Sequence, residues 1–130
     1  MTERRAVADT SVMVGAETGR IKVVEFADYS WAVSAVTLGE LRLGVLQATS
    51  PEIASVRLST YELARRFDPL PIDERVSDAW AVLVASLRVK DRKMPINDSW
   101  IAATAIANGV PVVTQDADYD DVPKLTVIKI

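Results

Sequence analysis

Short apolar segments alternate along this chain with longer segments of helical periodicity, and this alternation limits the fold more than any other feature. Strands are predicted at 6–9 and 31–34 and, near the end, at 110–114 and 126–130. Pro69 and Pro71 make segment 68–72 extended, because proline does not continue a helix. Strands that alternate with helices favour a parallel sheet with helices on both faces. The predicted fold is therefore an α/β domain of three layers, with a mostly parallel sheet of about five short strands.

The first half of the chain contains three predicted helices. One begins at Val12, capped by Thr10 or Ser11, and is short or broken because of its glycines. The next is capped by Ser34 or Thr37, and its expected inward residues are Leu38, Leu41, Val45 and Leu46. The third runs from the Ser50-Pro51 cap to about residue 66, and its expected apolar face is Ile53, Val56, Leu63 and Ala64. A further helix or turn is predicted at 21–27.

Two more helices are predicted in the second half. Asp73 caps the first of them, whose inward residues are expected to be Val76, Trp80, Leu83, Val84 and Leu87. The second spans 96–108 and stops at Asn108-Gly109, a typical helix end.

Composition excludes several classes of protein. The length of 130 residues predicts a single domain, 1–130, and 49% hydrophobic with 25% charged residues is ordinary for a globular protein. Without cysteine or histidine, the chain has no disulfide, thiolate nucleophile or Ser-His-Asp triad. No apolar run approaches the ~18 residues of a membrane helix, and no signal peptide is recognisable. We expect a cytoplasmic protein that does not enter a membrane.

Four carboxylates stand where an apolar segment meets a turn or helix: Asp9, Glu40, Asp98 and Asp116. Asp9 and Asp116 each follow a predicted strand, and parallel strands bring such residues to one crevice. Each residue has a simpler structural reading, as a helix cap, a first-turn acid, a turn acid or a solvated helix residue. Together, however, these acids would repel one another unless a cation neutralised them. Oxygen ligands suit Mg²⁺ or Mn²⁺, so we predict a metal site.

Five segments, taken in order, resemble the PIN-domain ribonucleases, and most closely the VapC toxins of VapBC toxin–antitoxin systems. These segments are 9–11, 33–44, 71–73, 97–105 and 112–119. By this resemblance, Asp9, Glu40, Asp98 and Asp116 match the acidic quartet that binds Mg²⁺ or Mn²⁺ and catalyses cleavage. Supporting roles are expected for Thr114, Asp118, Ser11 and Asn97, which stand in the same segments.

The resemblance also implies a function. It predicts a divalent-metal-dependent endoribonuclease toxin that cleaves transfer or ribosomal RNA, forms homodimers and is inhibited by a VapB-type antitoxin. Three alternatives are a metal-dependent phosphatase, a nuclease for nucleic acid other than RNA, and a PIN-like binding module without catalysis. Retention of all four acids argues against the last, because a binding module needs no cluster of mutually repelling charges.

A basic run precedes Asp98 and consists of Arg88, Lys90, Arg92 and Lys93. It is either a solvated helix end, where cations favour the helix dipole, or a set of RNA phosphate contacts. The net charge of −3 does not itself indicate nucleic-acid binding, but without the four carboxylates it becomes about +1. The sequence leaves both interpretations of the basic run open.

Overall fold

The computed structural model describes residues 4–21 and 29–130. In this part of the chain, five strands form one parallel sheet in the order β3-β2-β1-β4-β5. The strands are β1 (Arg4–Ala8), β2 (Tyr29–Ser34), β3 (Pro69–Leu70), β4 (Val112–Thr114) and β5 (Val127–Lys129). The predicted parallel sheet is thereby confirmed. The helix or turn expected at 21–27 lies, except for residue 21, outside the described residues.

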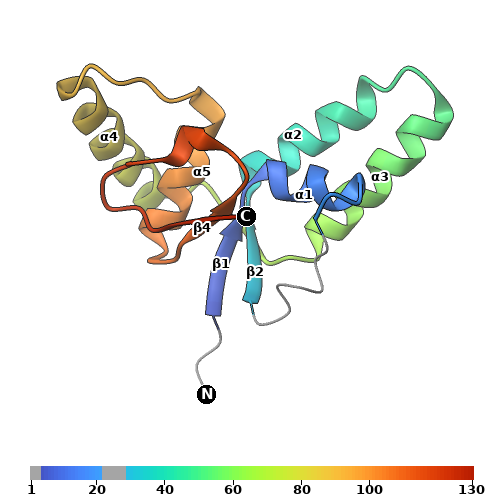
Figure 1. The fold of residues 1–130 in the computed structure, drawn as a ribbon, viewed down its shortest axis with the longest axis horizontal. Coiled ribbons are helices and arrows are strands. Elements are labelled where there is room, and N and C mark those ends of the chain that lie inside the picture. Colours follow the sequence, from blue (N-terminus) through green and yellow to red (C-terminus); the bar gives the residue numbers. More distant parts are fainter. Residues whose placement is uncertain (1–3, 22–28) are drawn as a thin grey trace.

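Helices cover both faces of the sheet, as the alternation of segments predicts. Figure 1 shows α4 and α5 on one side of β1 and β2, and α1, α2 and α3 on the other. Successive strand residues point to opposite faces, so Val7 and Val112 join the core beneath α4 and α5. Their neighbours Ala8 and Val113 join the second core, beneath α1, α2 and α3. Strands buried on both faces explain why the sequence shows continuous apolar runs there.

The three helices of the first half begin at capped positions. They are α1 (Thr10–Glu17), α2 (Ala35–Leu46) and α3 (Pro51–Arg65). Ser34 caps α2 and Ser50 caps α3, which confirms one of the two alternatives for α2 and the Ser-Pro start of α3. The hydroxyl caps and the start at Val12 predicted for α1 were wrong, because the helix begins at Thr10 and its cap is Asp9, which agrees with the simpler structural reading of that acid. Helix α1 runs through Gly15 and ends before Gly19, which has a φ of +78°.

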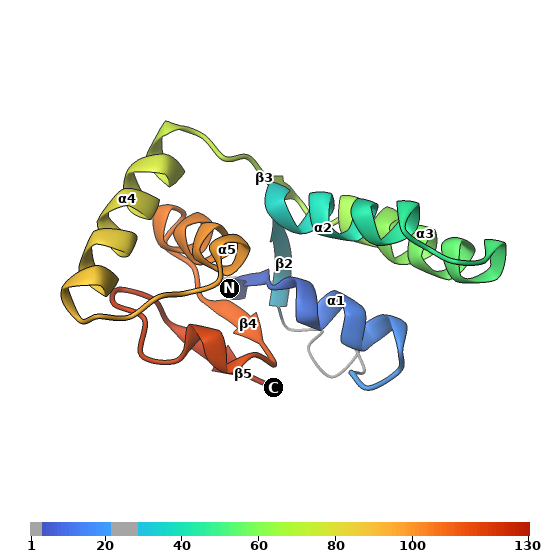
Figure 2. The ribbon, with the colours of Figure 1, turned by 90° about the horizontal axis from the view of Figure 1, so that it is seen from above.

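The apolar faces predicted for α2 and α3 were partly wrong. Leu41 and Ala64 are buried, but Leu46 is 67% exposed and Val56 is 54% exposed. Figure 2 shows the reason: the two helices form a hairpin that extends beyond the sheet, so much of their surface has no layer above it. Ile53 and Leu63 are also exposed for this reason.

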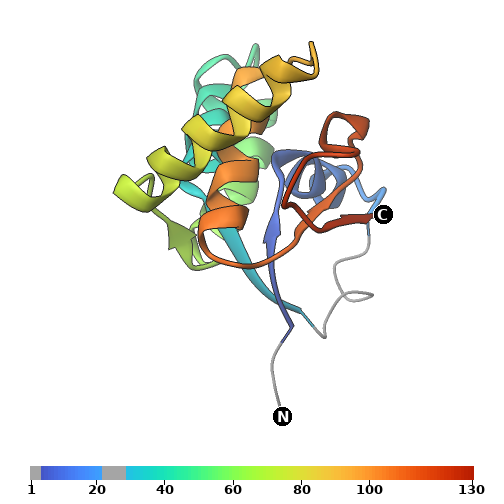
Figure 3. The ribbon, with the colours of Figure 1, turned by 90° about the vertical axis from the view of Figure 1, so that its left-hand side faces the viewer.

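The other face carries α4 (Glu74–Val89) and α5 (Ile96–Ala107), which pack side by side (Figure 3). Asp73 caps α4 through the backbone N–H of Val76 at 3.0 Å, as predicted. Of the five residues expected inward on α4, Val76, Leu83 and Leu87 are buried and the other two are half-buried. Helix α5 stops at Asn108, and the following Gly109 has a left-handed φ of +65°. Across the described ranges, no helix is long and apolar enough to cross a membrane.

Candidate active site

Acidic side chains gather at the carboxyl ends of β1 and β4. Strand β1 pairs in parallel with β4 on one side and with β2 on the other. The strands that follow β1 in sequence, β2 and β3, therefore lie on one side of it, and the later strands β4 and β5 lie on the other. Crevices of this kind, where strand order reverses, are the usual ligand sites of open α/β sheets. Asp9 follows β1 directly, and Asp116 lies two residues beyond β4, at the start of the short 3₁₀ helix η2 (Ala117–Tyr119).

Asp9 is buried, with only 3% of its surface exposed, and three hydrogen-bond donors hold its carboxylate in one orientation. The backbone N–H of Ser11 donates to its Oδ1, and the hydroxyl of Ser11 donates to its Oδ2 at 3.1 Å. The hydroxyl of Thr114, on β4, also donates to Oδ2. A buried carboxylate needs such partners, because an unpaired one is costly to remove from water.

Two hydroxyl groups connect the turn after β1 with the turn after β4. Besides donating to Asp9, Thr114 accepts the backbone N–H of Asp116 at 2.8 Å. Ser11 similarly accepts the backbone N–H of Gln115 at 3.2 Å. The turns that carry Asp9 and Asp116 are therefore tied to each other, and the two predicted supporting hydroxyls lie between the acids.

Within the described residues, one group of three acids has carboxylate oxygens within 4.8 Å of one another: Asp98, Asp116 and Asp118. Asp98 comes from the first turn of α5, whereas Asp118 belongs to η2. Asp116 caps η2 by accepting the backbone N–H of Asp118 at 2.9 Å. The sequence predicted only a supporting role for Asp118. In the structure its carboxylate is one of the three that converge, whereas Asp9 and Glu40 are not in this group.

Glu40 does not belong to this group of three acids, and polar neighbours hold its carboxylate. Its Oε1 is 2.6 Å from the hydroxyl of Thr10, which also lies 3.0 Å from the hydroxyl of Thr37. The side-chain amide of Asn97 donates to Oε2 at 3.4 Å. Asn97 precedes Asp98 on α5, so this contact links α2 to the helix that carries Asp98.

Burial and like charge together disfavour ionisation at this site. Burial is the main reason that the pKa of Asp98 rises to about 7, and the neighbouring Asp118, Asp9 and Asp116 raise it further. Burial also raises the pKa of Asp9, although its hydrogen bonds from Thr114 and Ser11 act in the opposite direction. A cation bound between these oxygens would favour their charged forms.

Tyr119 is a site residue that sequence reasoning did not single out. It is fully buried beneath the acids, and its hydroxyl donates to Oδ1 of Asp98 at 3.3 Å. Burial, followed by the charges of Asp9 and Asp98, raises the pKa of the phenol above its ordinary value, so it stays a donor. Its position directly after Asp118 was a signal, but a core aromatic was the simpler interpretation. Thr10 was likewise interpreted as a cap and instead contacts Glu40.

The four cations of the basic run have separate positions. Arg92 donates to the backbone carbonyls of Asp118, at 3.4 Å, and Asp120, so it holds the turn around η2. Arg88 and Lys93, with Arg92, line a pocket between α4 and α5, whereas Lys90 does not line it. The four cations therefore do not act as one unit: Arg92 holds the η2 turn, whereas Arg88, Lys90 and Lys93 are exposed to solvent.

The donor set fits a hard divalent cation. Every side-chain group that converges here is a carboxylate, hydroxyl or amide, which suits Mg²⁺ or Mn²⁺ and offers no soft ligand for other metals. Burial, and then the neighbouring acids, raise the pKa of Asp98, and a bound cation would offset both effects by favouring the charged carboxylate.

Comparison with known proteins identifies the family. Residues 6–125 match the family model of the PIN domain. The chain is 61% identical to Ribonuclease VapC4 of Mycobacterium tuberculosis over 130 residues, which is the whole of both chains. This chain belongs to the VapC family of PIN-domain ribonucleases. It is also 40% identical to Ribonuclease VapC5 of the same organism, over 91% of this chain and 87% of that protein.

Solved VapC structures agree with this assignment. The crystal structure of VapBC-5 from Mycobacterium tuberculosis superposes with a TM-score of 0.85 and 36% identity, over 97% of this chain and 98% of that one. VapBC2 from Rickettsia felis, bound to promoter DNA, superposes with a TM-score of 0.83 at 21% identity, which shows the common fold. The resemblance of this sequence to VapC toxins is confirmed.

Proposed function

We propose that this VapC-family chain is an endoribonuclease that uses a divalent cation, Mg²⁺ or Mn²⁺, to hydrolyse RNA phosphodiesters. The observation that carries the proposal is the convergence of Asp98, Asp116 and Asp118 within 4.8 Å, beside a buried Asp9, at the point where strand order reverses. The relatives named ribonucleases support RNA as the substrate.

The acidic side chains would bind the cation, and the hydroxyl side chains would orient the acids. Asp98, Asp116 and Asp118, with Asp9 and Glu40 beside them, would hold the cation, while Thr114 and Ser11 keep Asp9 directed toward its neighbours. The bound ion would lower the pKa of a water and neutralise phosphate oxygens during displacement. Tyr119 would hold the Asp98 carboxylate through its hydroxyl.

The direct test is cleavage of purified transfer RNA and ribosomal RNA with Mg²⁺ or Mn²⁺. We expect Asp116→Asn and Asp9→Asn to abolish cleavage, because the amide has nearly the same shape but lacks the charge that holds the ion. Asp78→Asn on α4 is a matched control, since this acid lies on a pocket away from the acidic residues. Cleavage that continues in excess chelator would contradict the metal mechanism.

The same assay separates the other readings of the sequence. Equal cleavage of single-stranded DNA would indicate a nuclease without RNA selectivity, and release of phosphate from a small phosphomonoester would indicate a phosphatase. A protein that binds RNA and metal without any turnover would be a PIN-like binding module.

We also propose a VapB-type antitoxin as partner. Its expected contact is the groove of about 400 Å³ between α1 and α3, which includes Met13, Val56 and Leu63. The exposed apolar residues of α3 would be covered there, and a solved relative is a VapBC complex. An antitoxin arginine that reached the acids would compete with the cation, so binding should weaken as Mg²⁺ rises. Co-expression with a VapB-type antitoxin, followed by titration across a magnesium series, tests this.

We also propose that the chain is a single domain that forms a homodimer and acts in the cytoplasm. A single domain over residues 1–130, a homodimer and action in the cytoplasm fit a toxin whose substrate is cellular RNA. Sedimentation at micromolar concentration tests the homodimer, and a single cooperative unfolding transition tests the single domain.

A further inference from the structure

A pocket of about 410 Å³ lies between α4, the loop that follows it and the first turn of α5, and the proposed chemistry does not use it. We refer to it as the α4–α5 pocket. Its lining combines aromatic, apolar and cationic side chains: Trp80, Val84, Leu87, Arg88, Asp91, Arg92, Lys93, Met94, Ile96 and Ser99. Three cations against one acid give this pocket a positive balance within a chain whose net charge is −3.

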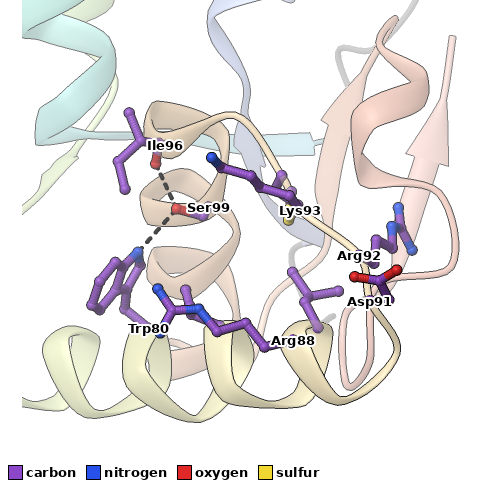
Figure 4. A pocket seen from close by; sticks show the side chains of 10 residues that line it. Trp80, Arg88, Asp91, Arg92, Lys93, Ile96 and Ser99 are labelled. Atoms are coloured by element: carbon purple, nitrogen blue, oxygen red, sulfur yellow. Dashed lines mark hydrogen bonds between the residues drawn. The ribbon is translucent and has the colours of Figure 1, made fainter.

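The cations divide into two groups. In Figure 4 the side chains of Arg88 and Lys93 extend toward Trp80 and Ser99, whereas Asp91 and Arg92 lie on the other side of the pocket. Arg92 is occupied by the carbonyls of the η2 turn. Arg88 and Lys93 are both exposed, so their charges face the pocket and the solvent. Two exposed cations over an apolar floor are suited to an anion that also carries an apolar surface.

Trp80 supplies the aromatic wall. It is stacked on Trp100 with ring centroids 4.4 Å apart and planes 3° apart, and its indole N–H donates to the hydroxyl of Ser99 at 2.9 Å. These contacts hold the ring rigidly, while its partial exposure leaves part of it accessible from the pocket. A fixed indole is a good stacking platform for nucleobases, with little preference among them.

The pocket and the acidic residues share one turn of helix. Ile96 and Ser99 line the pocket, whereas Asn97 and Asp98, from the same turn, contact the acidic site. A helix with its side chains is ~10 Å across, so the two sites are separated by a distance that a few nucleotides span. An RNA strand cut at the acids can therefore reach the pocket.

From this arrangement we infer that the α4–α5 pocket binds one nucleotide of the RNA strand, a few positions from the cleaved phosphate. The base stacks against Trp80, and Arg88 and Lys93 bind the adjoining phosphate. This inference rests on the proposed RNA substrate. It makes the pocket a second contact that holds the strand in position over the cation.

The test measures binding of a fluorescein-labelled single-stranded RNA across a salt series, in chelator and in the Asp116→Asn background so that the RNA stays intact. Arg88→Gln and Lys93→Gln are each expected to weaken binding about tenfold and to reduce the slope of log K against log salt by about 0.7, the value for one lost phosphate contact on a single strand. Lys90→Gln is the matched control from the same basic run, and it should leave both quantities unchanged because Lys90 does not line the pocket.

A second measurement tests the aromatic wall without RNA. Uridine 5′-monophosphate and adenosine 5′-monophosphate should both quench tryptophan fluorescence, whereas inorganic phosphate should not. The Trp80→Phe variant should lose this quenching, with circular dichroism as the check that its fold is intact. Equal losses from Arg88, Lys90 and Lys93, or no quenching by nucleotides, would overturn the inference. Pocket variants that change the sedimentation coefficient and leave RNA binding intact would identify a second copy of the chain as the occupant instead.

The two proposals fail in different ways. If the native chain cuts RNA and the pocket variants bind RNA normally, the pocket inference alone is overturned. If the native chain does not cut RNA but nucleotide quenching depends on Trp80, the ribonuclease proposal fails and the nucleotide pocket stands.

Discussion

At the scale of single residues, the hydroxyl of Thr114 connects two of the acidic residues. Its hydroxyl donates to Asp9 and accepts the N–H of Asp116, so Thr114→Val would remove one of the three donors to the buried Asp9 and the acceptor of the Asp116 N–H. We expect a loss of about 1–3 kcal/mol in the free energy of unfolding and a marked loss of cleavage, measured by urea denaturation and RNA assay. Thr114→Ser should retain most of both. Thr126→Val, at an exposed position, is the control.

Asp98 predicts a dependence of stability on pH in the metal-free protein. Its pKa rises from 3.8 to about 7 on folding, so the folded state binds a proton more tightly than the unfolded state. The resulting contribution is present below about pH 4 and is lost as the pH rises through about 7, so stability falls across that window. Thermal melts in chelator should show this fall, and Asp98→Asn should reduce it. A melting temperature that rises with pH over this range would contradict the assignment.

At the scale of elements, the loop between α4 and α5 holds the turn that carries Asp118. Arg92 makes this connection through the carbonyls of Asp118 and Asp120. Arg92→Ala should lower the free energy of unfolding by only about 1 kcal/mol, because the side chain is half-exposed. Metal affinity should fall more clearly, since Asp118 loses its fixed position. Calorimetric titration with Mn²⁺ checks this, and Lys90→Ala is the control.

At the scale of the whole molecule, a divalent cation should stabilise the fold. An ion that binds only the folded state adds about 2.7 kcal/mol to stability at one hundred times its dissociation constant. Melting temperature should therefore rise with Mg²⁺ or Mn²⁺, and the rise should disappear in Asp116→Asn. A cation-independent melting curve in the native chain would show that these acids, which meet from α5 and the β4–η2 turn, do not bind the ion.

Local sequence determined most of the elements. The Ser50 and Asp73 caps, the stop at Gly109 and the short apolar runs of the strands are each set by neighbouring residues, so they could be predicted without the fold. The sequence also predicted that acids directly after strands would lie close together, because parallel strands end at one edge of the sheet.

Tertiary structure alone decided the details of the site and the surface. That Asp118 joins Asp98 and Asp116, and that Trp80 packs on Trp100, depends on how α4, α5 and η2 meet across distant positions of the chain. An apolar helix face likewise becomes buried only where another layer covers it. Since α2 and α3 extend past the sheet, Val56 remains exposed although its periodicity is that of a core residue.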